Sequence, residues 1–260
     1  MTIVFVQHGP CTKGDRVRQS RQQGHKSNAR QAPKALASHS SEPATVETDA
    51  LTLSAQPLRD FTHKLASADP TPGGGSVSAA VAAFGAGLVR MVALLTSNSP
   101  KYRDVSEQCA TIARKAERLT DALLELVDED AASFDRVSDA YRLPKATDSD
   151  KRARSAQIQT ALEGAIATPL RVIRGTREIC DLAIELVDIG NANALSDVGC
   201  AALCAQASSQ GAALNVQINA AALKDREAAA RANEELNAAL AHVSLLAEVV
   251  LGKVRSRVEH

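Results

Sequence analysis

A helical spacing of apolar residues begins at Leu58 and continues almost to the end of this 260-residue chain. Apolar residues recur every three or four positions, as they do on one face of an α-helix, and no stretch shows the two-residue alternation of a half-buried strand. The longest example is the apolar stripe from Ile112 to Tyr141. The pattern predicts an all-α fold.

Helix-breaking residues divide the periodic region into segments. They lie at 69–75, 98–100, 143–144, 168–169 and 190–191. Because clusters of proline, glycine and asparagine end helices, these positions predict a bundle of about seven long helices. No repeat of fixed period is found, which disfavours a solenoid.

Residues 1–55 lack a sustained period and are rich in Ser, Gln, Ala and Pro. We therefore expect a disordered basic and polar tail over residues 1–55 and a helical domain over residues 56–260. The basic residues of the tail leave open a targeting sequence or a polyanion-binding arm, although a solvated leader is favoured. The apolar run Ile3–Val6 is too short for a signal peptide, which argues against secretion.

Charge and composition limit the classes of partner. The 30 lysines and arginines balance the 30 aspartates and glutamates, so no overall field attracts nucleic acid or an anionic membrane. Aromatic residues make up 2% of the chain, which removes the stacking surfaces that single-stranded nucleic acids need. The apolar stretch Val77–Thr96 contains Arg90 and is mainly alanine and glycine, so we expect a buried helix there and no membrane partner.

Cysteines and histidines give no sign of a metal or disulfide site. The five cysteines show no CxxC spacing, and the six histidines show no metal-binding spacing. We expect free thiols, a cytoplasmic protein and no metal.

The segment Pro70–Ser76 reads PTPGGGS and leads into a predicted helix. Its prolines stiffen the approach, its three glycines adopt conformations closed to other residues, and the N–H groups of a helix start bind phosphate or carboxylate groups. No lysine follows the last glycine, so this is not a Walker loop. The residues leave open an anion-binding loop or a tight connector.

The helix that follows carries small residues four positions apart, at Gly75, Ala79, Ala83 and Gly87. Such a row lets another body approach closely. The sequence leaves open a helix of the same bundle, a helix of a second subunit, or a ligand.

An acid interrupts the apolar stripe from Ile112 to Tyr141. Asp130 occupies a position that the period predicts to be buried, whereas Asp128 and Glu129 fall off the stripe and are expected to be solvated. A buried carboxylate is costly unless it is paired, and such acids concentrate at functional sites. Asp130 is therefore either a functional acid or a capped or ion-paired structural one.

Two further polar groups stand out. The segment Gly190–Asp197 reads GNANALSD, ends one predicted helix and starts another, so Ser196 or Asp197 is either a cap or a site residue. Asn215 and Asn219 lie one turn apart in an apolar helical segment. Their amides need partners, either on neighbouring helices or on a ligand.

Six segments, in unbroken order from Leu58 onward, resemble the methenyltetrahydrofolate cyclohydrolase and formiminotetrahydrofolate cyclodeaminase family. They are PTPGGGSVSAAVAAFGAGLVRMV, LVDEDAASF, YRLPKATDSDK, TPL, GNANALSDVG and ALNVQINAAALKD. The stand-alone cyclohydrolases are more similar than the cyclodeaminase half of the bifunctional enzyme, through TPGGGS, SDVG and ALNV.

The resemblance implies a homodimeric helical bundle with a folate site near the glycine loop and the subunit interface. It makes Asp130 the catalytic candidate, and it implies a tetrahydrofolate derivative as substrate without a metal or other cofactor. Where relatives carry a glycine and several lysines, this chain has Lys101 alone to meet the glutamate tail of folate. The substrate-binding positions that the resemblance implies are Gly73, Gly74, Gly75, Ser76, Lys101, Tyr102, Lys145, Asn191, Ser196, Asp197, Asn215 and Asn219.

The expected reaction is hydrolysis of 5,10-methenyltetrahydrofolate to 10-formyltetrahydrofolate. The alternative is cyclisation of formiminotetrahydrofolate with release of ammonia, which the same carboxylate can serve. A non-catalytic helical scaffold or ligand-binding module is a third possibility. The enzyme interpretation requires Asp130 and the glycine loop to line one cleft.

Overall fold

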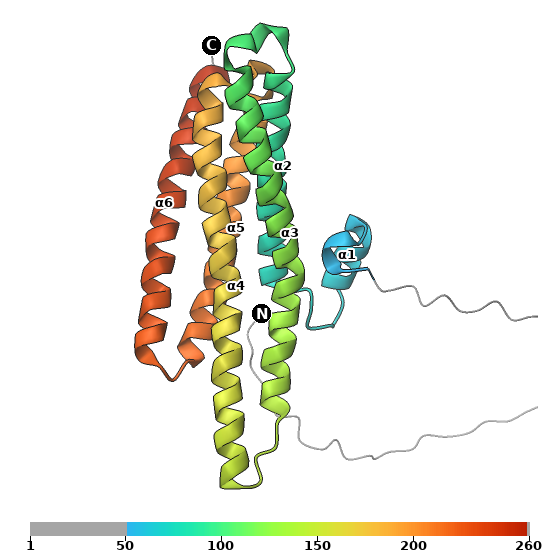
Figure 1. The fold of residues 1–260 in the computed structure, drawn as a ribbon, viewed down its shortest axis with the longest axis vertical. Helices are drawn as coiled ribbons and strands as arrows, with labels where there is room; N and C mark the ends of the chain where they lie inside the picture. Colours follow the sequence, from blue (N-terminus) through green and yellow to red (C-terminus); the bar gives the residue numbers. More distant parts are fainter. Residues whose placement is uncertain (1–50, 259–260) are drawn as a thin grey trace, which may run out of the picture. The chain divides into compact units, whose positions relative to one another are not determined.

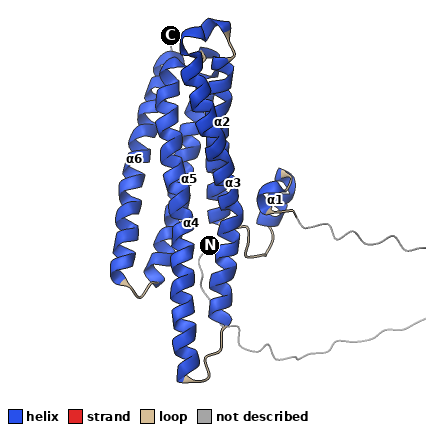
Figure 2. Cartoon of the chain, in the orientation of Figure 1, coloured by secondary structure: helices blue, strands red, loops and turns tan. Residues whose placement is uncertain are grey.

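The computed structural model describes residues 51–258, with side chains to Arg257. Six α-helices and three short 3-10 helices, with no strand, make up this part of the chain, so the all-α prediction is confirmed (Figures 1 and 2). Most of the predicted tail, residues 1–50, lies outside the described residues. The helices are η1 Leu53–Ala55, α1 Leu58–Leu65, α2 Gly74–Ser97, η2 Pro100–Val105, α3 Ser106–Arg142, α4 Asp148–Ile189, η3 Ala192–Ala194, α5 Leu195–Ala222 and α6 Arg226–Val258.

The predicted number of helices, about seven, was wrong because Pro169 does not end a helix. It lies inside α4, and only five of the six α-helices are long. Proline has no N–H, so the carbonyl of Ala165, four residues earlier, loses its partner within the helix. The side-chain amide of Asn219, on α5, donates to that carbonyl at 3.1 Å. A neighbouring helix thus replaces the missing hydrogen bond, and α4 continues.

The other predicted breaks fall where helices end. Leu143 is extended (ψ 150°) before Pro144 and closes α3, the conformation that a following proline favours. Thr147 and Asp150 form a reciprocal capping box that starts α4. Each break therefore follows from local chain chemistry.

Five long helices pack side by side (Figure 1). α2 packs between α3 and α5, and α4 packs against α3, α5 and α6. Leucine, isoleucine and valine fill the centre of the bundle, among them the fully buried Leu123, Ile173, Ile179 and Leu186. This packing fixes the start of α2 beside the middle of α3.

The small-residue side of α2 lies mostly inside the bundle. Gly75, Ala79 and Ala83 are buried, whereas a side chain at Gly87 would meet nothing within 4 Å. At Gly85 a Cβ would lie 3.2 Å from the backbone oxygen of Ala201, so α2 and α5 approach closely. Tight packing within one bundle therefore explains three of the four positions.

Two helices, α2 and α6, are long and apolar enough to cross a membrane. Half of the most apolar window of α2 is buried among its neighbours. The prediction of a buried helix therefore holds for one side of α2, and its other side is exposed.

Candidate active site

The first turn of α2 has no capping side chain of its own. Its N-cap residue, Gly73, offers no side-chain oxygen to the unpaired N–H groups of the helix start. Asp130, in the middle of α3, brings a carboxylate to that position. The hydroxyl of Ser76 donates to Oδ2 of Asp130 at 2.9 Å. The glycine loop and the acid of the apolar stripe therefore meet at the start of α2.

Gly75 makes this approach possible. A Cβ on Gly75 would lie 2.0 Å from Oδ1 and 2.7 Å from Oδ2 of Asp130. Cβ atoms do not approach other atoms so closely, so the carboxylate occupies the space that any side chain at this position would need. Only glycine at position 75 is compatible with this placement of Asp130.

Opposing effects act on the proton affinity of Asp130. Burial raises the pKa of its carboxyl group above the ordinary value, and hydrogen bonding from the side chain and backbone of Ser76 offsets part of that rise. The positive end of the α2 dipole also favours the charged form. A raised pKa makes the Asp130 carboxylate a stronger base than an ordinary aspartate, which suits a group that accepts and returns a proton.

The contact with α2 also has a structural consequence. A carboxylate at a helix start stabilises the helix as a cap, and here a neighbouring helix delivers the cap. The structural alternative for Asp130 is therefore a cap, and no ion pair to it is found among the described residues.

Serines attach the start of α2 to α5. The hydroxyl of Ser208 donates to the carbonyl of Ser78 at 2.6 Å, and the hydroxyl of Ser78 donates to the carbonyl of Gly74 at 2.7 Å. A Cβ on Gly211 would lie 2.5 Å from Oγ of Ser78. Asn215 is half-buried next to the loop, with its Nδ2 3.9 Å from the Cβ position of Gly74. The loop is thus held from both α3 and α5.

The acids beside Asp130 are paired. Glu129 forms an ion pair with Arg171 at 2.5 Å and accepts a hydrogen bond from Thr168 at 3.2 Å. Asp128 accepts a hydrogen bond from the Ser54 hydroxyl at 2.5 Å. The prediction that both acids are solvated is correct only in part: they are half-exposed, and η1 and α4 pack against the sides of α3 that carry them and supply partners.

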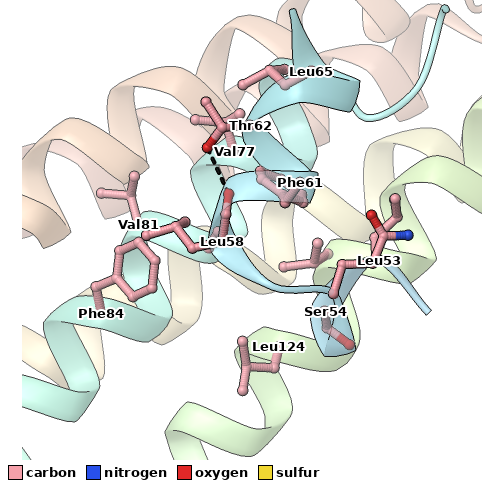
Figure 3. Close-up of a pocket in the computed structure, with 13 residues that line it drawn as sticks. Leu53, Ser54, Leu58, Phe61, Thr62, Leu65, Val77, Val81, Phe84 and Leu124 are labelled. Carbon is pink, nitrogen blue, oxygen red and sulfur yellow. Dashed lines mark hydrogen bonds between the residues drawn. The ribbon is translucent and has the colours of Figure 1, made fainter. Parts of the chain in front are cut away.

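An apolar groove of about 210 Å³ lies between α1, α2 and α3, near the start of α2 (Figure 3). None of the described residues that line it is charged. Its wall from α2 includes Val77 and Phe84, and its wall from α3 is formed by Leu124 and Val127. Asp130 does not line this groove, so the groove extends the apolar surroundings of the loop without reaching the carboxylate.

Asn219 is buried, and its amide is used by the carbonyl of Ala165. Asn215 and Asn219 therefore differ, although the sequence pattern treats them alike. Asn215 lies at the glycine loop, and Asn219 supports the proline-containing turn of α4.

Other residues implied by the resemblance lie at the far end of α2. There the backbone N–H of Asn191 donates to Thr96 at 2.9 Å, and the Tyr102 hydroxyl accepts from the N–H of Ala192 at 3.1 Å. Lys101 lies over the Tyr102 ring, 5.3 Å from its centre. Neither Ser196 nor Asp197 is the N-cap of α5, because both lie in its first turn. This end group consists of Lys101, Tyr102, Asn191, Ser196 and Asp197.

The two groups are far apart within one chain. Gly75 and Thr96 are separated by 21 residues of continuous helix, or roughly 30 Å at 1.5 Å per residue. Lys145 lies in the exposed turn between α3 and α4, roughly 20 Å along α3 from Asp130. Within one chain, the glycine loop meets Asp130 and Asn215 but not the end group or Lys145.

The described residues contain no cluster of three or more His, Cys, Asp and Glu side chains that could hold a metal ion. The polar groups at the start of α2 are the Asp130 carboxylate, backbone N–H groups and the nearby Asn215 amide, whose Nδ2 donates to the Gly211 carbonyl at 3.1 Å. This set suits an organic cation or a polar heterocycle.

Comparison with known proteins places the chain in a family. Residues 57–238 match the family model described as formiminotransferase-cyclodeaminase. The chain belongs to this family. The match begins just before α1 and includes the glycine loop, Asp130 and the far end group.

Individual members of the family are similar over most of the helical domain. Methenyltetrahydrofolate cyclohydrolase of Methylorubrum extorquens is 42% identical over 77% of this chain and 97% of its own length. Formimidoyltransferase-cyclodeaminase of Sus scrofa is 32% identical over 78% of this chain but only 37% of its own length. The crystal structure of formiminotetrahydrofolate cyclodeaminase from Thermotoga maritima superposes with a TM-score of 0.72 at 29% identity, covering 78% of this chain and 98% of that one. The higher identity to the cyclohydrolase agrees with the sequence prediction.

Sequence reasoning missed several residues around the family's glycine loop. Ser78, Ser208 and Gly211 join α2 to α5, and Thr168 joins α4 to Glu129. The available signal for Ser78 was a second serine, three residues beyond the last glycine. The partners on α5 are small residues in an alanine-rich helix, and nothing in their spacing marks them.

Proposed function

We propose that this protein is a methenyltetrahydrofolate cyclohydrolase that converts 5,10-methenyltetrahydrofolate into 10-formyltetrahydrofolate. One observation carries the proposal: the 42% identity to the Methylorubrum extorquens cyclohydrolase extends over 97% of that enzyme. Support comes from Asp130, whose carboxylate lies at the start of α2 with a raised pKa.

The chemistry needs one group that accepts and returns a proton. The Asp130 carboxylate takes a proton from water as the water oxygen bonds to the methenyl carbon. It returns that proton to N5 as the bond between the carbon and N5 breaks, and the hydroxyl proton of the intermediate leaves to solvent as the formyl C=O forms. The negative carboxylate also stabilises the bound cation. No electron is transferred, so we propose that no redox cofactor takes part.

Cyclodeamination is the second candidate. It is favoured by the raised pKa of Asp130, because a protonated carboxyl group can donate to the departing ammonia. In this reaction N10 attacks the formimino carbon on N5, a C–N bond forms, and the bond to the departing nitrogen breaks. The sequence relatives named as bifunctional enzymes and the Thermotoga maritima structure carry this activity in their names.

An assay with two substrates separates these activities. Purified protein is given methenyltetrahydrofolate or formiminotetrahydrofolate, and the methenyl absorbance and free ammonia are followed. Loss of the chromophore faster than in buffer supports the cyclohydrolase, and its appearance together with ammonia supports the cyclodeaminase. No change with either substrate contradicts both and favours a binding module or scaffold.

We also propose that the protein is a homodimer that pairs through α2 and α5. These neighbouring helices expose large apolar side chains, including Phe84, Leu95, Leu203 and Leu214. From Cys200 to Ala222 the exposed side of α5 has no charge, and on α2 only Arg90 is charged and pairs with Glu117 of α3. The solvent side of a helix in a monomer is usually charged, so this surface suits a partner of the same kind.

A two-fold axis across the middle of α2 would set the two copies of this helix antiparallel. Lys101 of the partner subunit would then lie near the glycine loop of the first subunit. Such pairing would join the two separated groups of site residues into one folate site. We propose a cytoplasmic enzyme with folate as its small-molecule partner and no nucleic-acid or membrane partner.

A further inference from the structure

The hydroxyl of Ser76 is committed to Asp130. Ser76 is fully buried (0% exposed), and its single hydroxyl proton is donated to Oδ2 of Asp130. A serine hydroxyl has one proton to donate, so this group has no donor left for a ligand. The family resemblance implies a substrate-binding role for Ser76, and the geometry favours another.

We propose that Ser76 is a positioning residue, which orients the Asp130 carboxylate for proton transfer and does not itself touch the substrate. The inference rests on the proposed function of Asp130 as the acid–base group. The Ser76 hydroxyl would hold the Asp130 carboxylate in one orientation.

Three features restrict the orientation of Asp130. Ser76 lies in the first turn of α2, where its backbone is fixed by the helix. The Ser76 hydroxyl holds Oδ2, and the bare Cα of Gly75 gives Oδ1 its place. The carboxylate thus contacts two successive residues of one rigid turn, an arrangement that fixes the direction of a proton acceptor.

Ser76 also acts on the charge of Asp130. Its hydrogen bonding lowers the pKa of the carboxyl group against the larger rise that burial causes. Removal of the hydroxyl should therefore make the carboxylate harder to form. In an enzyme that needs the carboxylate, the acid limb of the pH–rate profile should move to higher pH.

Ser78 provides a matched control. It lies two residues further along the same helix, it is also buried, and its hydroxyl donates to the carbonyl of Gly74 instead of to an acid. Ser78→Ala removes a buried hydroxyl of the same size without touching Asp130.

The test compares Ser76→Ala, Ser78→Ala and wild type in the cyclohydrolase assay across pH. For Ser76→Ala we expect kcat at neutral pH to fall by about tenfold, the effect of losing one hydrogen bond to a charged group, with partial recovery at higher pH. KM should stay within about twofold of wild type, because substrate contacts are unchanged. Ser78→Ala should keep the wild-type pH limb.

A raised KM with an unchanged kcat and pH limb would overturn the inference, since it would place Ser76 against the substrate. An unchanged kcat, KM and pH limb would overturn it too. Asp130→Asn separates failure of the proposed acid–base role of Asp130 from failure of the positioning role of Ser76. If Asp130→Asn is active, the role of Asp130 fails. If Asp130→Asn is inactive but Ser76→Ala behaves like wild type, only the positioning role of Ser76 fails. Should Ser76→Ala not fold, Ser76→Cys keeps the volume with a weaker donor, and the same shift of the pH limb is required of it.

Discussion

The carboxylate of Asp130 occupies the place where a side chain at Gly75 would stand, with Oδ1 2.0 Å from the Cβ position. The two residues are 55 positions apart in the sequence and belong to different helices. A side chain cannot be added at position 75 while the Asp130 carboxylate keeps this place, so the identities of the two residues depend on one another.

Gly75→Ala should displace Asp130 and lower kcat by at least about 100-fold, because a misplaced acid–base group loses its geometric advantage. The methyl group should also destabilise the fold by about 1–3 kcal/mol through overpacking. In an Asp130→Ala background the space is free, so the stability cost of Gly75→Ala should largely disappear in a denaturant-unfolding cycle.

Gly164→Ala is the control for that experiment, since a side chain at Gly164 meets nothing within 4 Å. It should leave activity unchanged and stabilise α4 by roughly 0.5–1 kcal/mol. Equal costs of Gly75→Ala with and without Asp130 would contradict the coupling.

Asp130→Asn tests the carboxylate as an acid–base group. The amide keeps an oxygen that can accept from Ser76, so the cap on α2 and the folate site should remain. Turnover should fall by at least about 100-fold, because the proton acceptor is gone and the cation loses its counter-charge. Steady-state kinetics with melting curves check both parts, and a folded variant within about threefold of wild-type kcat would exclude the catalytic role.

The pH dependence of stability should carry the sign of the raised pKa of Asp130. The folded state binds this proton more tightly than the unfolded chain, so the group adds stability at low pH that is lost as pH rises through the raised pKa. The unfolding free energy of wild type minus that of Asp130→Asn should therefore fall as pH rises from the ordinary aspartate pKa to the raised pKa of the folded state. Above the raised pKa the difference should be constant.

Asp150 offers a control of opposite sign. Its capping bonds with Thr147 lower its pKa, so its contribution is present above the ordinary aspartate range and is lost as pH falls through the lowered pKa. The difference between wild type and Asp150→Asn should rise with pH. The same slope for both variants would show that the two environments were misassigned.

Pro169 and Asn219 should be energetically coupled. Asn219→Ala leaves the carbonyl of Ala165 buried without a donor, which should cost about 1–3 kcal/mol. In a Pro169→Ala background the restored N–H can bond to that carbonyl, so the same change should cost clearly less. Chemical denaturation of the four proteins gives the coupling, and a coupling of zero would mean that Asn219 serves another purpose.

The proposed dimer surface can be tested by charge. Phe84 is 52% exposed on α2, and Phe84→Glu should produce monomers in sedimentation velocity and reduce folate turnover, because the shared site comes apart. Leu245, 61% exposed on α6, is the matched control, and Leu245→Glu should stay dimeric and active. A monomeric wild-type protein, or a fully active monomer of Phe84→Glu, would contradict the pairing.

Sequence periodicity predicted the helical class and most helix ends because those features depend on local chain chemistry. It failed at Pro169, where the partner that rescues the helix is Asn219, 50 residues further along. It identified Asp130 because an acid on an apolar stripe is locally anomalous. The pairing of that acid with Gly75 and Ser76 depends on helix packing, which the spacing of residues within one helix does not encode.

The resemblance grouped site residues by family position and not by distance. Lys101 and Asp197 therefore entered the same set as Gly74, although a whole length of α2 separates them within one chain. Asn215 and Asn219 shared one prediction because they lie one turn apart on α5. In the structure Asn215 lies next to the glycine loop, whereas Asn219 donates to the Ala165 carbonyl of α4.

The proline within α4 has a consequence for the way the domain assembles. Before α5 docks, the Ala165 carbonyl has no N–H donor four residues further along α4, so this turn lacks one of the hydrogen bonds of a complete helix. The backbone amides of α4 next to Pro169 should therefore gain part of their protection from hydrogen exchange through the docking of α5. One side chain, Asn219, thereby makes the completion of one helix conditional on its neighbour, and the two should open as a single cooperative unit.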